Sequence, residues 1–77
     1  MTPIGERITE ARKKKNMSVG QVAIKARRSK ATIVSLIYNA KRPRLDTLIN
    51  IADALEVSID YLAGRTDVME MQKNGLD

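Results

Sequence analysis

The 77-residue chain contains no cysteine and no histidine, and its four glycines are scattered. Without cysteine there are no disulfides, thiolate metal sites or thiol nucleophiles, and without histidine the usual general base and the commonest metal ligand are missing. The glycines spell neither a phosphate-binding loop nor a dinucleotide fingerprint. These absences argue against an enzyme and against a metal or cofactor site, and nothing in the sequence indicates a small-molecule ligand.

Long apolar runs are also absent. No stretch approaches the roughly 20 residues that span a bilayer, and the N-terminus lacks the pattern of a signal peptide. Hydrophobic residues make up 43% of the chain and charged residues 30%, which is typical of a folded protein and not of a disordered one. A chain this short forms one small domain with a compact core. We expect a soluble cytoplasmic protein with no membrane partner.

Charge is unevenly divided along the chain. Residues 1–44 hold twelve lysines and arginines against two acids, a net charge of +10, whereas residues 45–77 hold two against seven, a net charge of −5. Such a concentration of positive charge in a small domain usually serves an anionic partner, most often nucleic acid. The alternative is a solvated lysine-rich face that only aids solubility.

The N-terminal third predicts two short helices. Thr2 can cap a first helix that has Pro3 at its first position, and Asn16 suits a left-handed stop after that helix. Ser18 followed by Gln21 has the spacing of a capping box, which predicts that a second helix begins directly after the serine.

The stretch SKATIVSLIYNAKRPR favours a strand by composition, because several of its residues are β-branched or aromatic. A helix is favoured by the capping residue Ser29, by the lack of alternation, and by the lack of a second strand pattern to pair with. The apolar residues of one helical face are Ile33, Leu36 and Ile37. We therefore expect a third helix that follows a tight turn and ends at Asn39 in a left-handed conformation.

The C-terminal half predicts a longer helix and a short one. An apolar stripe along the first of them consists of Leu45, Leu48, Ile51, Ala52 and Leu55. Ser58 can cap the last helix and Gly64 can end it. We expect one domain over residues 1–65 and a C-terminal tail over residues 66–77, which either frays or supports a dimer.

Three stretches in order resemble the Cro/lambda-repressor-like (XRE) family over residues 4–67. IGERITEARKKKNMS is similar to the family's first helix, VGQVAIKARRSKATI to its helix-turn-helix, and LDTLINIADALEVSIDYLAGRTD to its last two helices. The resemblance implies a compact all-α domain of five helices with the helix-turn-helix at helices 2 and 3. It also implies a protein that binds double-stranded DNA, regulates transcription, and commonly acts as a dimer on paired half-sites.

By this resemblance, the helix over residues 29–38 enters the major groove of DNA. The family's base-facing positions correspond to Lys30, Ala31, Thr32 and Ser35, and helical spacing places Val34 and Tyr38 on the same outer face. Small apolar side chains can touch thymine methyl groups, hydroxyls can bond to donor or acceptor edges, and Lys30 can reach guanine. No Arg, Asn or Gln stands early in this helix, so we expect modest direct readout, supported by DNA shape or dimer spacing. The alternative is a plain solvent-exposed face.

A second set of residues is expected to contact DNA phosphates: Ser18, Gln21, Arg28, Lys41, Arg42 and Arg44. The start of the second helix offers free N–H groups and a positive dipole end, and basic residues follow the third helix. Two departures from the family pattern bear on this surface. Val19 stands where a polar phosphate-binding residue is common, and Arg27 replaces the usual turn glycine. A positive φ at Arg27 stores strain of about 1 kcal/mol.

Five further apolar residues have no clear place in the core: Ile24, Ile49, Val68, Met69 and Met71. The last four predict a homodimer formed through the C-terminal helices, which leaves both basic faces free for DNA half-sites. The alternative for these residues is partial burial in a small core.

Three classes of function remain. The favoured one is a sequence-specific DNA-binding transcription regulator, a repressor of the phage or mobile-element type. The second is a protein-interaction module, an antitoxin or adaptor that holds its partner through Val34, Ile37 and Tyr38. The third, a membrane-surface protein, is disfavoured because the cations do not form one face of a long amphipathic helix.

Overall fold

The computed structural model describes residues 1–39 and 42–70, and these residues form five α-helices. In chain order the helices are α1 (Pro3–Lys14), α2 (Val19–Ala26), α3 (Lys30–Tyr38), α4 (Leu45–Leu55) and α5 (Ile59–Leu62). This described part contains no strand, and none of its helices is long and apolar enough to cross a bilayer. The prediction of five short helices is confirmed.

Side-chain hydroxyls start four of the five helices. Each accepts a hydrogen bond of 2.9–3.1 Å from the backbone N–H three residues later, and the capping residues are Thr2, Ser18, Ser29 and Ser58. The predicted capping box is present, because the side chain of Gln21 accepts from the Ser18 N–H at 2.8 Å. A cap of this kind stabilises a helix by about 1 kcal/mol. Helices of 4–12 residues are too short to persist alone, so they depend on caps and packing.

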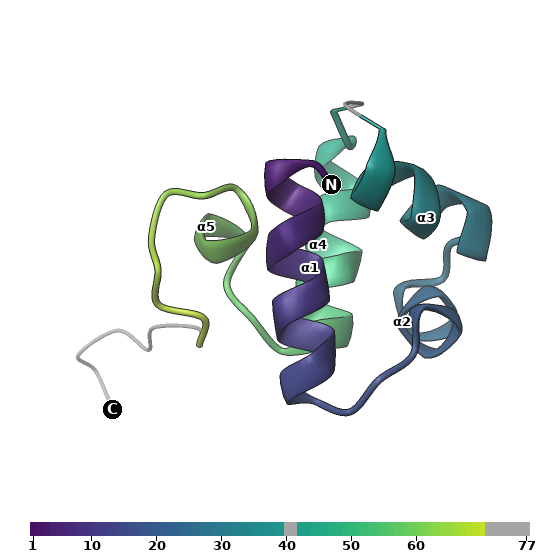
Figure 1. The fold of residues 1–77 in the computed structure, drawn as a ribbon, viewed down its shortest axis with the longest axis horizontal. Coiled ribbons are helices and arrows are strands. Elements are labelled where there is room, and N and C mark those ends of the chain that lie inside the picture. Colours follow the sequence, from purple (N-terminus) through teal and green to yellow (C-terminus); the bar gives the residue numbers. More distant parts are fainter. Residues whose placement is uncertain (40–41, 71–77) are drawn as a thin grey trace.

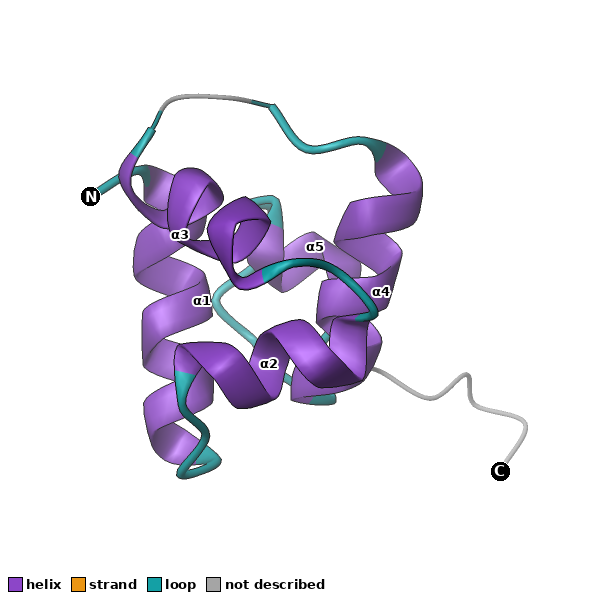
Figure 2. Ribbon diagram, turned by 90° about the vertical axis from the view of Figure 1, so that its right-hand side faces the viewer, coloured by secondary structure: helices purple, strands orange, loops and turns teal. Residues whose placement is uncertain are grey.

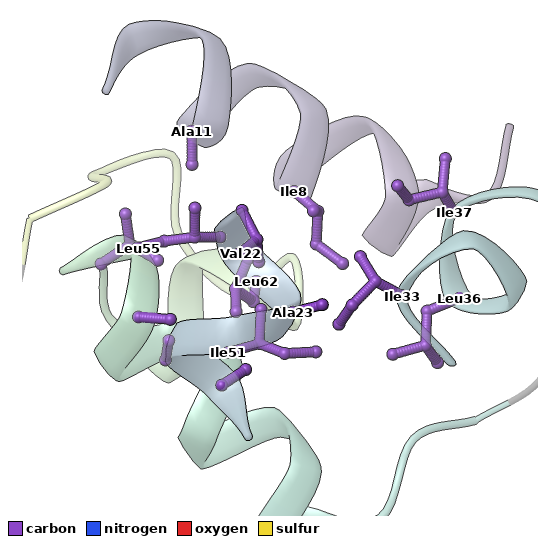
Figure 3. Close-up of a cluster of buried hydrophobic side chains, with 14 of the residues drawn as sticks. Ile8, Ala11, Val22, Ala23, Ile33, Leu36, Ile37, Ile51, Leu55 and Leu62 are labelled. Atoms are coloured by element: carbon purple, nitrogen blue, oxygen red, sulfur yellow. The ribbon is translucent and has the colours of Figure 1, made fainter. Parts of the chain in front are cut away.

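The helices surround one hydrophobic core. In Figure 1, α1 lies in front of α4, with α2 and α3 on one side of this pair and α5 on the other. Figure 2 shows α2 and α3 together on the face that bridges α1 and α4. Every helix contributes a side chain that is at most 1% exposed, among them Ile8, Val22, Ile33, Ile51, Leu55 and Leu62 (Figure 3). Burial of each such side chain favours folding by about 1.5–3 kcal/mol.

The predicted apolar stripe of α4 is only partly right. Ile51 is fully buried, but Leu45 is 68% exposed, so its prediction as a core residue is wrong. Thr47 is buried instead, and its hydroxyl accepts a 3.1 Å hydrogen bond from Nε of Arg28 in the turn after α2. Thr47 and Ile51 lie four residues apart and share one face of α4. Leu45 lies two positions before Thr47 and therefore points to the opposite side, toward solvent.

The predicted left-handed conformation of Asn39 is also wrong. Its φ of −110° and ψ of 145° are extended. A left-handed residue normally lets following N–H groups satisfy the last carbonyls of a helix. Here Thr2, near the N-terminus, does so: its N–H donates to the Ile37 carbonyl oxygen at 2.8 Å and its Oγ1 donates to the Leu36 carbonyl oxygen at 2.6 Å. The exit of α3 needs no left-handed residue.

A glycine allows α1 to touch the backbone of α3. Gly5 is buried, and a Cβ atom at this position would come within 2.8 Å of three backbone atoms of Ile37, namely O, Cα and C. Real Cβ atoms do not approach backbone this closely, so any larger residue must push the two helices apart.

Residues 66–70 pack back onto the helices. Arg7 donates through Nη1 to the Thr66 carbonyl oxygen at 2.8 Å and pairs through Nη2 with the Asp67 carboxylate at 2.9 Å. The N-cap residue of α5 donates its N–H to the Met69 carbonyl oxygen at 2.9 Å, and the Met69 side chain packs partly buried against the core. These contacts tie Thr66, Asp67 and Met69 to the helices, and residues 71–77 lie outside the described part.

Tyr61 links α5 to α1. Its ring is 2% exposed and lies beneath the Arg7 guanidinium, which is 4.7 Å from the ring centre. Its hydroxyl donates to Oε2 of Glu10 at 3.0 Å. Burial disfavours the tyrosinate, and the bond to the Glu10 carboxylate favours the neutral hydroxyl, so together they raise the Tyr61 pKa to about 12.

Candidate nucleic-acid interface

The turn between α2 and α3 is closed by two backbone hydrogen bonds. The Arg28 N–H donates to the Ala23 carbonyl oxygen at 3.0 Å, and the Arg27 N–H donates to the Ile24 carbonyl oxygen at 3.2 Å. This pair of bonds is a Schellman motif, which requires a left-handed residue. Arg27 supplies it with φ 56° and ψ 42°, so a residue other than glycine holds the strained conformation. The tight turn fixes the angle between α2 and α3.

Helix α3 separates an inner face from an outer face. Ile33, Leu36 and Ile37 are at most 4% exposed, as predicted. The opposite face carries the residues predicted to contact bases, which are exposed or half-buried: Lys30, Ala31, Thr32, Val34, Ser35 and Tyr38. The structure thus brings all six to one continuous surface, on which Val34 is 38% exposed and Tyr38 is 65% exposed.

Two polar positions on this surface are held in place. The Ser29 hydroxyl accepts from the Thr32 N–H at 3.1 Å and lies 2.9 Å from Oγ1 of Thr32. Near the other end, Nδ2 of Asn39 donates to Oγ of Ser35 at 3.2 Å, which leaves the serine hydrogen free to donate outward. Asn39 was not among the predicted site residues, although its position four residues after Ser35, directly after the helix, indicates that the two side chains can meet.

The residues predicted to contact phosphates are in three situations. Ser18 and Gln21 are exposed at the start of α2, where the side chain of each accepts a hydrogen bond from the backbone N–H of the other. Arg42 and Arg44 are exposed between α3 and α4, and no ion pair with either is found among residues 1–39 and 42–70. Lys41 lies outside the described residues.

Arg28 is engaged within the chain. Its Nε donates to Thr47 at 3.1 Å, its Nη1 donates to the Arg27 carbonyl oxygen at 3.0 Å, and its Nη2 is 3.4 Å from the Asp46 carboxylate. All three nitrogens of the guanidinium therefore bind the protein itself. The side chain ties the end of α2 to the start of α4, a contact that the sequence pattern does not reveal.

An open groove of about 400 Å³ runs beside α3. One wall is the side of α3 that carries Ala31, Thr32 and Ser35, and the other is formed by the segment that leads into α4. Arg42 and Arg44 line this second wall, so two cations border the edge of the predicted base-facing surface.

The helix N-termini differ in their local charge. The first turns of α2 and α3 contain no acidic residue, whereas α1, α4 and α5 each contain one. A helix N-terminus carries about half a positive charge, which a nearby carboxylate offsets. The two helices of the helix-turn-helix therefore keep positive ends that no acid of their own first turn offsets, an arrangement that favours an anionic partner.

The residues predicted to form a dimer interface do not share one environment. Ile49 on α4 is 37% exposed and Val68 is 49% exposed, so both are available for a contact. Met69 packs against the core of its own chain, which is the alternative of partial burial, and Met71 lies outside the described residues.

Comparisons with known proteins agree with this geometry. The family described as Helix-turn-helix matches residues 8–62 of the chain. The chain belongs to the helix-turn-helix family. It is also similar to the N-terminal DNA binding domain of SinR from Bacillus subtilis, with 33% sequence identity and a TM-score of 0.73 over 78% of this chain and 88% of that chain. A search of curated proteins gives no significant match.

These matches confirm three predictions about the helix-turn-helix chain. The resemblance to the XRE family and the compact five-helix, lambda-repressor-like fold are both correct. The family consists of binding domains and not of enzymes, so the prediction that the chain is not an enzyme is confirmed. Within the described residues, no cluster of three or more acidic side chains is arranged to hold a metal ion.

Proposed function

We propose that this protein binds double-stranded DNA sequence-specifically and regulates transcription, with α3 lying in the major groove. The observation that carries this proposal is the outer face of α3, bordered by the exposed Arg42 and Arg44, together with the N-termini of α2 and α3, which have no acid in their first turns. DNA offers a matching pair of features, a groove lined by base edges and two flanking rows of phosphates. The similarity to the N-terminal DNA binding domain of SinR supports the same function.

The two halves of the surface have different tasks in this proposal. The outer face of α3 reads base edges: Ala31 and Val34 contact thymine methyl groups, and the hydroxyl of Ser35 bonds to a base edge. Arg42, Arg44 and the start of α2 hold phosphates, which sets affinity and register without reading sequence. The face lacks a bidentate reader such as arginine on guanine, so DNA shape and half-site spacing supply part of the specificity.

We further propose that two copies bind paired half-sites and that the protein acts as a cytoplasmic repressor of the phage or mobile-element type. Exposed apolar side chains at Ile49 and Val68 lie outside the α2–α3 motif, so a contact through them leaves both copies of α3 free. The resemblance to the lambda-repressor-like family supports the repressor type. Light scattering that finds only 8.6 kDa monomers at high micromolar concentration contradicts the dimer.

The first test is selection of random duplex DNA by the purified protein, followed by affinity measurements at two salt concentrations. We expect an enriched motif with two-fold symmetry, bound more tightly than scrambled duplex. Salt-sensitive binding without any motif contradicts sequence specificity and indicates a DNA-coating protein. No binding at any salt concentration contradicts the proposal and favours the protein-interaction module, whose partner would contact Val34 and Tyr38.

The division of tasks is tested with three variants. Arg42→Ala should weaken binding to every duplex and reduce the slope of log affinity against log salt by about 0.9, the value for one phosphate contact. Arg65→Ala is the matched control, because it removes the same charge from the chain that follows α5. Ser35→Ala should change the preference among duplexes more than the overall affinity. A loss of sequence preference in Arg42→Ala with an unchanged salt slope contradicts this division.

A further inference from the structure

We propose that Thr2 is a positioning residue for sequence reading, because it fixes the C-terminal turn of α3 from outside the helix-turn-helix. This inference rests on the proposed function above and assigns part of its specificity to a residue that is not on the DNA-facing surface. Thr2 precedes α1 and is separated from its partners on α3 by 34 and 35 positions in the sequence.

The Thr2 hydroxyl joins the first turn of α1 to the last turn of α3. Its oxygen accepts from the Gly5 N–H at 2.9 Å, and the hydroxyl donates to the Leu36 carbonyl oxygen at 2.6 Å, with the Ile37 carbonyl oxygen 3.2 Å away. The Thr2 backbone N–H donates to the Ile37 carbonyl oxygen at 2.8 Å. One residue therefore satisfies two of the carbonyls that the end of a helix leaves without partners.

The contact between the two helices leaves no room for adjustment. Gly5 packs directly on the Ile37 backbone, where even a Cβ atom would overlap, so α3 is held both by hydrogen bonds and by backbone contact. Helix α3 itself contributes no left-handed cap at this end, since Asn39 is extended. The position of the last turn of α3 thus depends on the segment around Thr2.

The last turn of α3 carries one end of the base-facing surface. Tyr38 is the last residue of the helix, and Ser35 lies one turn earlier, bonded to Asn39. The other end, with Lys30 and Ala31, is held separately by the Ser29 cap and the Schellman turn. Loss of the Thr2 hydroxyl should therefore affect recognition at the base pairs nearest Ser35 and Tyr38 and spare those nearest Lys30.

Three variants test the inference. Thr2→Val removes the hydroxyl and keeps the shape and the N–H, whereas Thr2→Ser restores the hydroxyl. Ser58→Ala is the matched control, because it removes an equivalent hydroxyl cap from α5, which lies away from α3 (Figure 1). The first measurement is the affinity ratio, that is, the affinity for the selected duplex divided by that for a scrambled duplex. The second compares the selected duplex with duplexes that each carry one base-pair substitution along the site, and the third is amide hydrogen exchange.

We expect Thr2→Val to lower the affinity ratio roughly 3- to 10-fold, the range for loss of one uncharged hydrogen bond. The loss should be concentrated at one end of each half-site, and the amides of Tyr38 and Asn39 should exchange faster while that of Ile33 does not. Thr2→Ser should match the parent protein, and Ser58→Ala should keep the parent's ratio despite its lower stability.

Two results overturn the inference. An unchanged ratio in folded Thr2→Val, or an equal loss in Ser58→Ala, shows that Thr2 has no role beyond general stability. Failure of the proposed function is seen earlier, in the parent protein alone, when no duplex is preferred over scrambled DNA. A selective parent with an unaltered Thr2→Val variant therefore overturns this inference and leaves the proposed function standing.

Discussion

Replacing Gly5 with alanine should separate α1 from α3. The new Cβ would overlap three backbone atoms of Ile37, which cannot move aside as the end of a flexible side chain does. Overpacking of this kind costs about 1–3 kcal/mol, while the better helix propensity of alanine returns up to about 1 kcal/mol. We expect a net loss of about 1–2 kcal/mol from a total that is about 4–12 kcal/mol for a chain of this length.

The measurement is urea unfolding at equilibrium, with thermal unfolding beside it. A loss of 1–2 kcal/mol corresponds to a midpoint lower by roughly 4–16 °C in a domain of this size. The control is Gly20→Ala in α2, where the Cβ meets only Oγ of Ser18 at 3.8 Å, an ordinary contact. This variant should be as stable as the parent protein or more stable by up to about 1 kcal/mol. Equal stability of the two alanine variants refutes the close approach of α1 to α3.

Three further predictions concern single side chains. Folding raises the Tyr61 pKa from 10.0 to about 12, so the stability that its neutral hydroxyl provides is complete below pH 10 and is lost as the pH rises through 12. The difference in unfolding free energy between the parent protein and Tyr61→Phe should therefore shrink between pH 10 and pH 12. Arg27→Gly should raise the free energy of unfolding by about 0.5–1 kcal/mol, because it relieves the left-handed strain; calorimetry showing a lower midpoint contradicts this. Asp67→Ala should leave stability unchanged, since the Asp67 side chain is 97% exposed. Arg7→Ala should lower stability by about 1–2 kcal/mol, because it removes the contact with the Tyr61 ring and the hydrogen bond to the Thr66 carbonyl oxygen. Denaturant curves that show the larger loss in Asp67→Ala contradict this prediction.

Helix starts were predictable because their signals are local. Ser18 with Gln21, and Ser29 and Ser58 alone, supply the hydroxyl that a helix N-terminus needs, and each cap forms as the sequence predicts. The inner face of α3 was predictable for a similar reason, since helical spacing alone puts Ile33 and its neighbours on one side.

Two errors in the predicted fold have a common cause in contacts between distant residues. Asn39 is extended because Thr2 has already satisfied the carbonyls of α3. Leu45 faces solvent because the side of α4 that carries Thr47 and Ile51 packs inward, where Thr47 also accepts a hydrogen bond from the distant Arg28. Propensity and periodicity describe one segment at a time, so neither reveals which distant residue supplies a partner.

The candidate site divides in the same way. Exposure of the outer face of α3 follows from the spacing of its apolar residues, and the structure bears it out. The engagement of Arg28 with α4 and the packing of Met69 on the core depend on where other elements lie, and a count of charges or of unplaced apolar residues does not reveal them.

The anchoring of α3 at both ends also bears on the thermodynamics of association. Ser29 and the Schellman turn fix its first turn, and Thr2 fixes its last, so the helix loses its conformational entropy during folding and not during binding. The heat-capacity change on entering a DNA groove should therefore reflect only the surface removed from water, without the larger negative contribution that accompanies coupled folding.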